Sequence, residues 1–418
     1  MSLDVYLYGE PIGQLLPAGG TDYQLAYDAE RVEGFGEGGA VLSNSLLGTD
    51  EPYSSDTTRA YVEGLLPEGG RRERIAAELG IDPGDGYSLI AALGRDCPGA
   101  VTFLPEDEPE AEMDSDAVAW LSDGELEELT AAEPQRLFDP NREERMRFSL
   151  PGARHKLSLM REERSGRWAW PTHDMPSTHI VKPESGEHPD LVANEMFCTT
   201  VAREAGLMVA PTAVRMIGGR RCLVAERFDR APEDGVTERF HQESFSQALG
   251  FAPGAGAPGV AAEGPGFAES CGLLRATGEE PGIILLIAGA LCHYLLGNGD
   301  AHGANFGLLF AYEGAVLAPF YDLCSTAVYD DPVHTGMTIA LDYYTPASID
   351  DLARIGEESG IGLDHCRRVA GNMAERVSGA LLPAVTQAKE EGWHAPVVEG
   401  ITQIAVDRAL ALSEEVEG

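Results

Sequence analysis

The chain between residues 297 and 305 reads GNGDAHGAN, and this stretch indicates how the protein around it folds. It follows the apolar run Ile283–Leu296, whose fourteen residues are too few to span a bilayer and predict a buried core helix. Two strand-like segments, Phe306–Phe310 and Val316–Pro319, come next and predict a hairpin. The hairpin has the right length to return Tyr321-Asp322 to the quoted stretch.

A second ordered region precedes this one. Thr178–Lys182 is a predicted strand, and Asp190–Ala205 is a predicted helix with a glycine directly after it as its stop. A hairpin follows, with the strands Ala213–Ile217 and Arg221–Phe228 joined by the turn Gly218-Gly219. Because strands come first and helices later, the sequence predicts a two-lobed α+β unit.

The remaining segments are less regular. Residues 1–105 hold short strand-like runs and helical stretches near Thr58–Leu66 and Arg71–Leu79, a pattern typical of a small α+β module. The acidic, proline-containing segment Pro105–Glu110 predicts a linker or exposed loop. Residues 251–282 are rich in Gly, Pro and Ala, and they predict a mobile loop because such a composition buries little surface.

Composition excludes several classes of protein. With 43% hydrophobic and 7% aromatic residues, the 418-residue chain is typical of a globular protein with a sizeable core. Its start has no basic or apolar leader, and its seven cysteines form no Cys-x-x-Cys pair, so we expect a cytoplasmic protein with free thiols and no zinc or membrane. The net charge of −39 argues against general nucleic-acid binding and suits a basic protein partner or a salt-rich cytoplasm.

Three polar residues around the quoted stretch point to phosphoryl transfer. That reaction needs a carboxylate beside the attacking hydroxyl and metal ions that bridge the phosphates. The spacing from Asp300 to Asn305 lets the carboxylate face an acceptor hydroxyl while the amide turns back towards Mg²⁺. Asp322 would be the main metal ligand, since Mg²⁺ prefers carboxylate oxygen and substrate phosphates.

Lysine is scarce, and its positions are informative. Only Lys156, Lys182 and Lys389 occur in the chain. Lys182 ends a predicted strand, and Glu195 follows on a predicted helix, in the order that kinases use for a phosphate-binding lysine held by a helix carboxylate. A surface ion pair is the alternative interpretation of this pair, but the scarcity of lysine favours the functional one.

Weaker signals lie elsewhere. The segment Ser149–Lys156 could form a phosphate-covering loop around Gly152, although an ordinary turn would explain it as well without the downstream residues. The segment Glu226–Phe228 either meets an adenine or is a plain strand end. His293 is interpreted as a core histidine, and His302 as a residue that shapes its loop or touches phosphate.

With these residues in place, the chain closely resembles the HipA family of serine/threonine kinase toxins over nearly its whole length. The segments that carry the resemblance are Tyr8–Glu10, Gly94–Val101, Ser149–Lys156, Thr178–Lys182, Asn194-Glu195, Glu226–Arg230, Asp300–Asn305 and Pro319–Asp322. The resemblance implies a protein-kinase-like fold with a HipA-like subdomain at 1–110, an N-lobe with its connector and phosphate loop at 111–235, and a mainly helical C-lobe at 236–418. An all-helical C-terminal lobe is expected.

The resemblance also implies roles for single residues. Asp300 would be the catalytic base, Asn305 and Asp322 would hold magnesium, and Glu195 would orient Lys182. Contacts to ATP are expected from Pro151, Gly152, Ala153, Arg154, His155, Lys156, Lys182, Glu226, Arg227, Phe228, His302, Gly303, Ala304, Asn305, Tyr321 and Asp322. Ser149 matches the serine that the family phosphorylates in itself, which shuts the enzyme down because phosphate adds negative charge beside ATP.

The family further implies partners. Its known members phosphorylate aminoacyl-tRNA synthetases, and a small helix-turn-helix antitoxin from the same operon neutralises them. Three departures stand out: Ala304 replaces the usual lysine before the asparagine, Arg154-His155 replaces a polar-acidic pair, and Ile349–Gly360 is acidic where the family is basic. The last departure argues against direct DNA contact, whereas a basic antitoxin still suits the acidic surface.

Two alternatives stay open. A small-molecule kinase of the aminoglycoside-phosphotransferase kind has a similar catalytic loop, but it has no need of the N-terminal module. A catalytically silent protein that only binds an antitoxin is slightly favoured by Ala304, whereas Lys182, Asp300, Asn305 and Asp322 weigh against it. Hydrolase and P-loop motifs are absent from the sequence.

Overall fold

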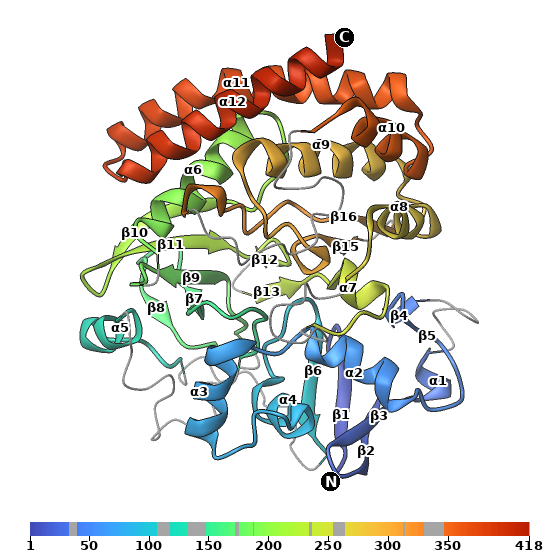
Figure 1. The fold of residues 1–418 in the computed structure, drawn as a ribbon. Helices are drawn as coiled ribbons and strands as arrows, with labels where there is room; N and C mark the ends of the chain where they lie inside the picture. Colours follow the sequence, from blue (N-terminus) through green and yellow to red (C-terminus); the bar gives the residue numbers. More distant parts are fainter. Residues whose placement is uncertain are drawn as a thin grey trace. The chain divides into compact units, whose positions relative to one another are not determined.

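The computed structural model describes residues 1–32, 40–106, 118–131, 148–171, 175–186, 188–233, 236–253, 264–311, 314–329 and 347–417. The fold combines helices and sheets, as the sequence predicts (Figure 1). Two compact units divide the chain: the first contains Met1–Pro183 and Arg215–Pro253, and the second contains Glu184–Val214 and Gly254–Gly418. Within the described ranges, no helix has the length and apolar character needed to cross a membrane.

The first unit begins with a four-stranded antiparallel sheet in the order β3-β2-β1-β6. In β1 (Leu3–Leu7) alternate side chains are buried, which is the period-2 pattern of a strand with one face on a core. Helices α2 (Ser55–Glu63) and α4 (Gly86–Leu93) add apolar side chains to this core, which is continuous from Leu3 to Phe103. The other elements of this part are β2 (Glu10–Gly19), β3 (Asp22–Tyr27), α1 (Ala29–Val32), β4 (Ala40–Ser43), β5 (Leu46–Leu47), α3 (Gly69–Leu79) and β6 (Val101–Pro105).

A second sheet in the order β10-β11-β9-β7-β8 carries the candidate lysine. The predicted strand around Lys182 is β9 (His179–Pro183), and the predicted hairpin is β10 (Thr212–Ile217) with β11 (Arg220–Glu226). Gly218 and Gly219 both have positive φ, as the tight turn requires. The remaining elements are α5 (Asp123–Leu129), β7 (Leu157–Arg161), β8 (Trp168–Ala169), β12 (Arg230–Glu233), β13 (Val236–Arg239), β14 (Gln242–Ser244) and α7 (Phe245–Ala248).

The second unit is mainly helical. Helix α9 (Glu280–Leu296) contains the predicted core helix but begins three residues earlier, and its C-terminal two thirds is buried on all sides. Helices α11 (Leu363–Glu390) and α12 (Pro396–Glu417) run alongside each other in Figure 1, and α11 also packs on α9 and on α6 (Leu191–Glu204). The predicted hairpin is β15 (Gly307–Ala311) with β16 (Gly314–Leu317), and the unit is completed by two 3₁₀ turns, η4 (Gly303–Asn305) and η5 (Ala327–Tyr329), and by α10 (Ile349–Glu358).

The prediction of a loop over residues 251–282 is wrong in part, because α8 (Phe267–Ala276) lies within it. The Glu269 carboxylate accepts the N–H of Gly266 (2.6 Å) and caps the start of this helix. Phe267, Cys271 and Leu274 are buried on one side of it. Most of the glycines and prolines that suggested a loop precede this apolar stripe. Residues 254–263, and residues 107–110 of the predicted connector, lie outside the described part of the chain.

Candidate active site

The quoted stretch begins where α9 ends. Gly297 caps the helix with a φ of 74°, and a side chain there would meet Ala327 at 2.8 Å. The carbonyl of Gly297 accepts hydrogen bonds from the N–H groups of Thr326 (2.9 Å) and Ala327 (3.0 Å). Glycine is therefore required for its conformation and for the close approach of the segment that follows Asp322.

Asn298 connects the core helix to Asp300. Its amide nitrogen donates to Nδ1 of His293 (2.8 Å), and its Oδ1 accepts the N–H of Asp300 (2.9 Å). Burial lowers the pKa of His293 to about 4, although the negative charge of Asp322 opposes this shift, so the imidazole is neutral. His293 is thus a core histidine as predicted, although its Nε2 has no hydrogen-bond partner among the described residues.

The backbone of Asp300 is fixed by hydrogen bonds, and its side chain is half exposed. Its carbonyl accepts from the His302 N–H (2.9 Å) and from Nδ2 of Asn305 (2.7 Å), whereas 49% of its side chain is exposed. With the amide nitrogen of Asn305 engaged in this way, its Oδ1 is directed away from the Asp300 carbonyl. The loop therefore presents one carboxylate and one amide oxygen.

His302 shapes this loop. Its Nδ1 accepts the N–H of Ala304 (3.2 Å) and caps η4, while Nε2 lies 3.5 Å from the Asp300 carboxylate. The hydroxyl of Tyr321 donates to the Ala304 carbonyl (2.8 Å), which joins the loop to the end of the hairpin. The structure thus brings together Asp300, His302, Ala304, Asn305 and Tyr321.

Asp322 has a left-handed backbone, with a φ of 56°. Such a conformation is uncommon outside glycine and persists only where neighbouring contacts impose it. On one side, Phe320 pairs with Met208 and Ala210 (N···O 2.8 and 2.9 Å). On the other side, the side chain of Asn194 makes two hydrogen bonds of 2.8 Å to the N–H and carbonyl of Ser325.

Asn194 is a positioning residue whose role the sequence analysis missed. It is fully buried in α6, and its amide nitrogen also lies 3.1 Å from the Tyr329 hydroxyl. The signal available in the sequence was an Asn next to a Glu within a largely apolar predicted helix. When such a helix is buried, its amide side chains must find hydrogen-bond partners. The adjacent Glu195 is 3% exposed. Lys182, 8% exposed, belongs to the first unit and Glu195 to the second, so their pairing stays a prediction.

The predicted phosphate loop lies in the first unit. Ser149 is fully buried, and its hydroxyl donates to the Leu65 carbonyl (2.5 Å). Gly152 has a φ of 93°, and Nζ of Lys156 folds back to donate to the Pro151 carbonyl (2.7 Å). Within this loop, Ala153 is exposed, while Arg154 and His155 are partly buried. The ring of His155 contacts the carbonyl of Leu129 (2.9 Å), and burial lowers its pKa.

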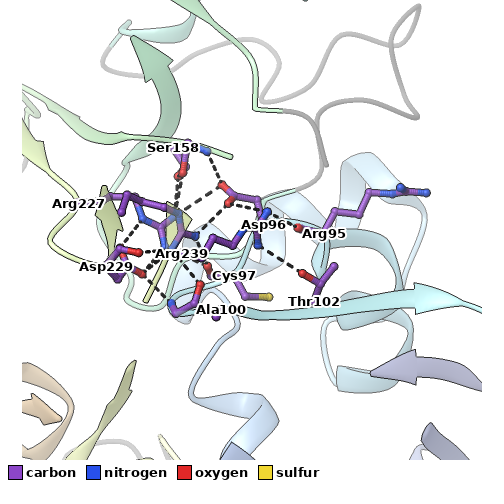
Figure 2. A network of polar contacts seen from close by, with 12 residues as sticks. Arg95, Asp96, Cys97, Ala100, Thr102, Ser158, Arg227, Asp229 and Arg239 are labelled. Carbon is purple, nitrogen blue, oxygen red and sulfur yellow. Dashed lines mark hydrogen bonds and ion pairs between the residues drawn. The ribbon is translucent and has the colours of Figure 1, made fainter. Parts of the chain in front are cut away.

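Arg227, predicted to contact ATP, is engaged with other protein groups. Its guanidinium donates to Asp229 (2.9 and 2.7 Å), to Ser177 (2.8 Å) and to the Cys97 carbonyl (2.9 Å), and its N–H donates to Thr178 (2.9 Å). Figure 2 shows Arg227 close to Asp229, Asp96 and Ser158 in one network of polar contacts. The flanking Glu226 is exposed and Phe228 is partly buried, so these two are better placed than Arg227 to meet a nucleotide.

Arg227 belongs to a buried network of five charges. Asp96 lies within 3.6, 3.2 and 3.8 Å of Arg227, Arg230 and Arg239, and Asp229 lies 3.0 Å from Arg230. Burial alone would raise the pKa of Asp96, but the three guanidinium groups lower it below its usual value. The network joins the N-terminal module to the strand end at Glu226, and sequence patterns did not reveal it.

Comparison with known proteins identifies the family. Residues 148–381 match the HipA-like C-terminal domain, and residues 3–104 match the HipA N-terminal domain. The chain belongs to the HipA family. The putative kinase Y4mE of Sinorhizobium fredii is 34% identical over 395 residues, which cover 91% of this chain and 90% of that protein. The serine/threonine-protein kinase toxin HipA of Shewanella oneidensis is 28% identical, over 80% of this chain and 79% of that protein.

A solved structure confirms the relationship in three dimensions. The Shewanella oneidensis HipA chain, from a complex of HipA, HipB and operator DNA, superposes with a TM-score of 0.76 at 25% identity. The match covers 99% of this chain and 96% of that one. The predicted kinase-like α+β fold of the HipA type is therefore confirmed, whereas the roles of the individual site residues stay predictions.

Proposed function

We propose that this member of the HipA family is an ATP-dependent serine/threonine protein kinase and the toxin of a toxin–antitoxin pair. The observation that carries the proposal is the Asp300 carboxylate, half exposed on a loop whose backbone is fixed by Asn298, His302 and Asn305. A carboxylate held in this way can accept a proton without moving, which is what a general base requires. A silent antitoxin-binding protein would have no need of such an arrangement.

In the proposed reaction, the hydroxyl oxygen of a substrate serine or threonine attacks the γ-phosphorus of ATP. The bond to the β-phosphate oxygen breaks, ADP leaves, and the hydroxyl proton passes to Asp300. The Oδ1 of Asn305 and the carboxylate of Asp322 are oxygen donors of the kind that Mg²⁺ takes, and the imposed backbone of Asp322 fixes the direction of its Cα–Cβ bond. A bound Mg²⁺ would neutralise charge on the phosphates.

The first unit would bind the nucleotide. Lys182 would pair with the phosphates and be oriented by Glu195, and the loop from Pro151 to Lys156 would cover them. Tyr321, His302 and Gly303 would line the nucleotide from the catalytic loop. Because Ala304 replaces the family's lysine, one positive charge is missing, and Lys182 would carry more of the phosphate charge here.

The proposed partners follow from the family. The Shewanella relative is described in complex with HipB and operator DNA, and an antitoxin of this kind, carrying a basic face, suits a chain with a net charge of −39. A translation-related protein such as an aminoacyl-tRNA synthetase is the proposed substrate, in the cytoplasm. Ser149 is the proposed site of self-phosphorylation, and because it is fully buried, the loop must leave its place before Ser149 can react.

Intact mass before and after Mg-ATP tests the proposal, with Asp300→Asn and Ser149→Ala as variants. A gain of one phosphate that maps to Ser149 and is lost in both variants supports it. A protein that starts unmodified and stays unchanged contradicts self-phosphorylation and favours the antitoxin-binding alternative. Transfer of phosphate to an aminoglycoside-like alcohol, with none to any protein, would favour the small-molecule kinase.

A further inference from the structure

The phosphate loop is attached to the start of α3. Gly152 forms a parallel bridge with Pro67, and the N–H of Glu68 donates to the Gly152 carbonyl (3.4 Å). The N–H of Gly152 in turn donates to the Oε1 of Glu68 (3.0 Å). Both partners belong to the region that matches the HipA N-terminal domain, so that domain contacts the loop at its glycine.

Arg71 holds the two ends of the same loop. Its guanidinium donates to the carbonyls of Leu150 (2.6 Å) and Lys156 (3.5 Å), and the residue is 6% exposed. Burial lowers its pKa to about 10, which the nearby charge of Glu68 opposes, so it stays charged at neutral pH. One cation therefore joins Leu150, near the start of the loop, to Lys156 at its end.

The carboxylate of Glu68 accepts a hydrogen bond from the Gly152 N–H, which a nucleotide phosphate would otherwise accept. Backbone N–H groups in glycine-containing turns bind anions, and the left-handed Gly152 makes such a turn. In this conformation the Gly152 N–H already donates a hydrogen bond to the Glu68 carboxylate, and the ammonium of Lys156 donates one to the Pro151 carbonyl. A nucleotide phosphate would have to displace Glu68 to reach the same N–H.

We propose that Glu68 and Arg71 are positioning residues of the phosphate loop. Arg71 sets the span of the loop, and Glu68 takes the place of a nucleotide phosphate at Gly152 until ATP displaces it. This inference rests on the proposed function, since it requires that the loop bind ATP. It gives the N-terminal domain a direct effect on nucleotide affinity through a single carboxylate.

Titration calorimetry on the full chain tests the role of Glu68. An Asp300→Asn background prevents phosphate transfer, and the binding of Mg-ATP and of adenosine is compared for Glu68→Gln, Glu68→Ala and the control Glu73→Gln, an exposed glutamate of α3. We expect Glu68→Gln to bind Mg-ATP roughly 5-fold tighter, because a charged hydrogen bond is replaced by a neutral one, and Glu68→Ala tighter still. Adenosine binding and the Glu73→Gln protein should be unchanged, since neither involves the contact with phosphate.

The possible outcomes separate this inference from the proposed function. Equal Mg-ATP affinities, or weaker binding by the Glu68 variants, overturn the inference and leave the kinase intact. Failure of every protein, including the parent, to bind Mg-ATP overturns both. Trypsin supplies a readout without nucleotide: cleavage after Arg154 should be faster in Glu68→Ala than in Glu73→Gln, and equal rates would contradict the attachment of the loop by Glu68.

Discussion

The Asp300 carboxylate and the carboxylates of the buried network are held by different means. In the second unit, Asp300 leaves 49% of its side chain in solvent and is fixed through its backbone. In the first unit, the side chains of Asp96 and Asp229 are 2% exposed and are surrounded by Arg227, Arg230 and Arg239. Both regions contain aspartates, but one aspartate is partly in solvent and the other two are buried among three arginines.

The difference concerns how readily each carboxylate can accept a proton. A carboxylate neutralised by several buried guanidinium groups is a poor proton acceptor, since its pKa is depressed and its lone pairs are occupied. The Asp300 carboxylate lies 3.5 Å from Nε2 of His302 and is half exposed, so it is more accessible to a substrate than Asp96 or Asp229. Substitution of single carboxylates, or of a side chain that holds the backbone, should therefore change either the unfolding free energy or the rate of phosphate transfer.

The largest effect is expected from Asp229→Asn. The substitution removes one of the two buried anions beside Arg227 and Arg230 and leaves Asp96 alone against three buried guanidinium groups. Breaking a buried pair in this way costs about 4 kcal/mol of unfolding free energy. Denaturant unfolding measures the loss. Asp22→Asn is the matched control, because its pair with Arg59 is exposed (57% and 35%) and should contribute less than about 1 kcal/mol. A similar small loss for both variants would remove the distinction between the two regions.

Asp300→Asn should show the reverse pattern. We expect phosphate transfer to fall by roughly 10²- to 10³-fold, equivalent to about 3–4 kcal/mol, because the general base is lost. The unfolding free energy should change by less than about 0.5 kcal/mol, since the side chain is half exposed. Single-turnover transfer and denaturant unfolding are measured on the same protein, beside Asp364→Asn at another exposed position. Unchanged transfer would mean that Asp300 is not the base.

The sequence predicted the elements around Asp300 better than the contacts between them. The helix before the loop, the hairpin after it and the strand of Lys182 are confirmed, since each is a local apolar run with a glycine or proline near its end. The prediction of a loop over 251–282 is wrong at residues 267–276, because composition averaged over a glycine-rich stretch hid the apolar face of α8.

The buried network could not be predicted from the sequence. Asp96 and Arg227 are more than a hundred residues apart, and nothing local distinguishes a buried Arg from a surface one. The hydrogen bonds of Asn194 with Ser325 and of Glu68 with Gly152 were unpredictable for the same reason. Each joins segments far apart in the sequence through one side chain and the backbone of one residue. Fold class follows from periodicity, but positioning residues depend on tertiary contacts.

Asn194→Leu removes the hydrogen bonds that hold the backbone of Ser325, three residues after the proposed magnesium ligand Asp322. The substitution keeps the volume but leaves the N–H and carbonyl of Ser325 buried without partners, and we expect a loss of about 2–3 kcal/mol in unfolding free energy. The Mg²⁺ concentration for half-maximal transfer should also rise, because Asp322 loses the contact that imposes its backbone. Thr200→Val on the same helix is the control: its Oγ1 has no partner in the described structure, so removal should be neutral. An unaltered Mg²⁺ requirement in Asn194→Leu would separate stability from metal binding.

A third kind of carboxylate gives the smallest expected effect. Glu243 is 1% exposed and accepts hydrogen bonds from the backbone and side chain of Asn44 (3.1 and 2.6 Å) and from the hydroxyl of Ser43. Burial raises its pKa to about 7, and these hydrogen bonds oppose the shift without cancelling it. Asp300 is half exposed and Asp229 is buried among arginines, whereas Glu243 is buried with hydrogen-bond donors but no ion pair among the described residues, and its pKa is raised.

The pH dependence of Glu243→Gln measures this directly. Because the folded pKa lies above the unfolded value of about 4.3, Glu243 stabilises the fold below that value, and the contribution is lost as pH rises towards 7. The buried His241, with a pKa lowered to about 4, has the opposite slope, so the parent protein alone gives a mixed profile. Glutamine cannot ionise, and the stability of Glu243→Gln relative to the parent should therefore rise by about 2 kcal/mol between pH 5 and pH 8. Urea unfolding at both pH values, with the exposed Glu10→Gln as control, tests this. A pH-independent difference would mean that Glu243 stays ionised in the fold, and hydrogen bonds alone would then suffice to keep a buried carboxylate charged.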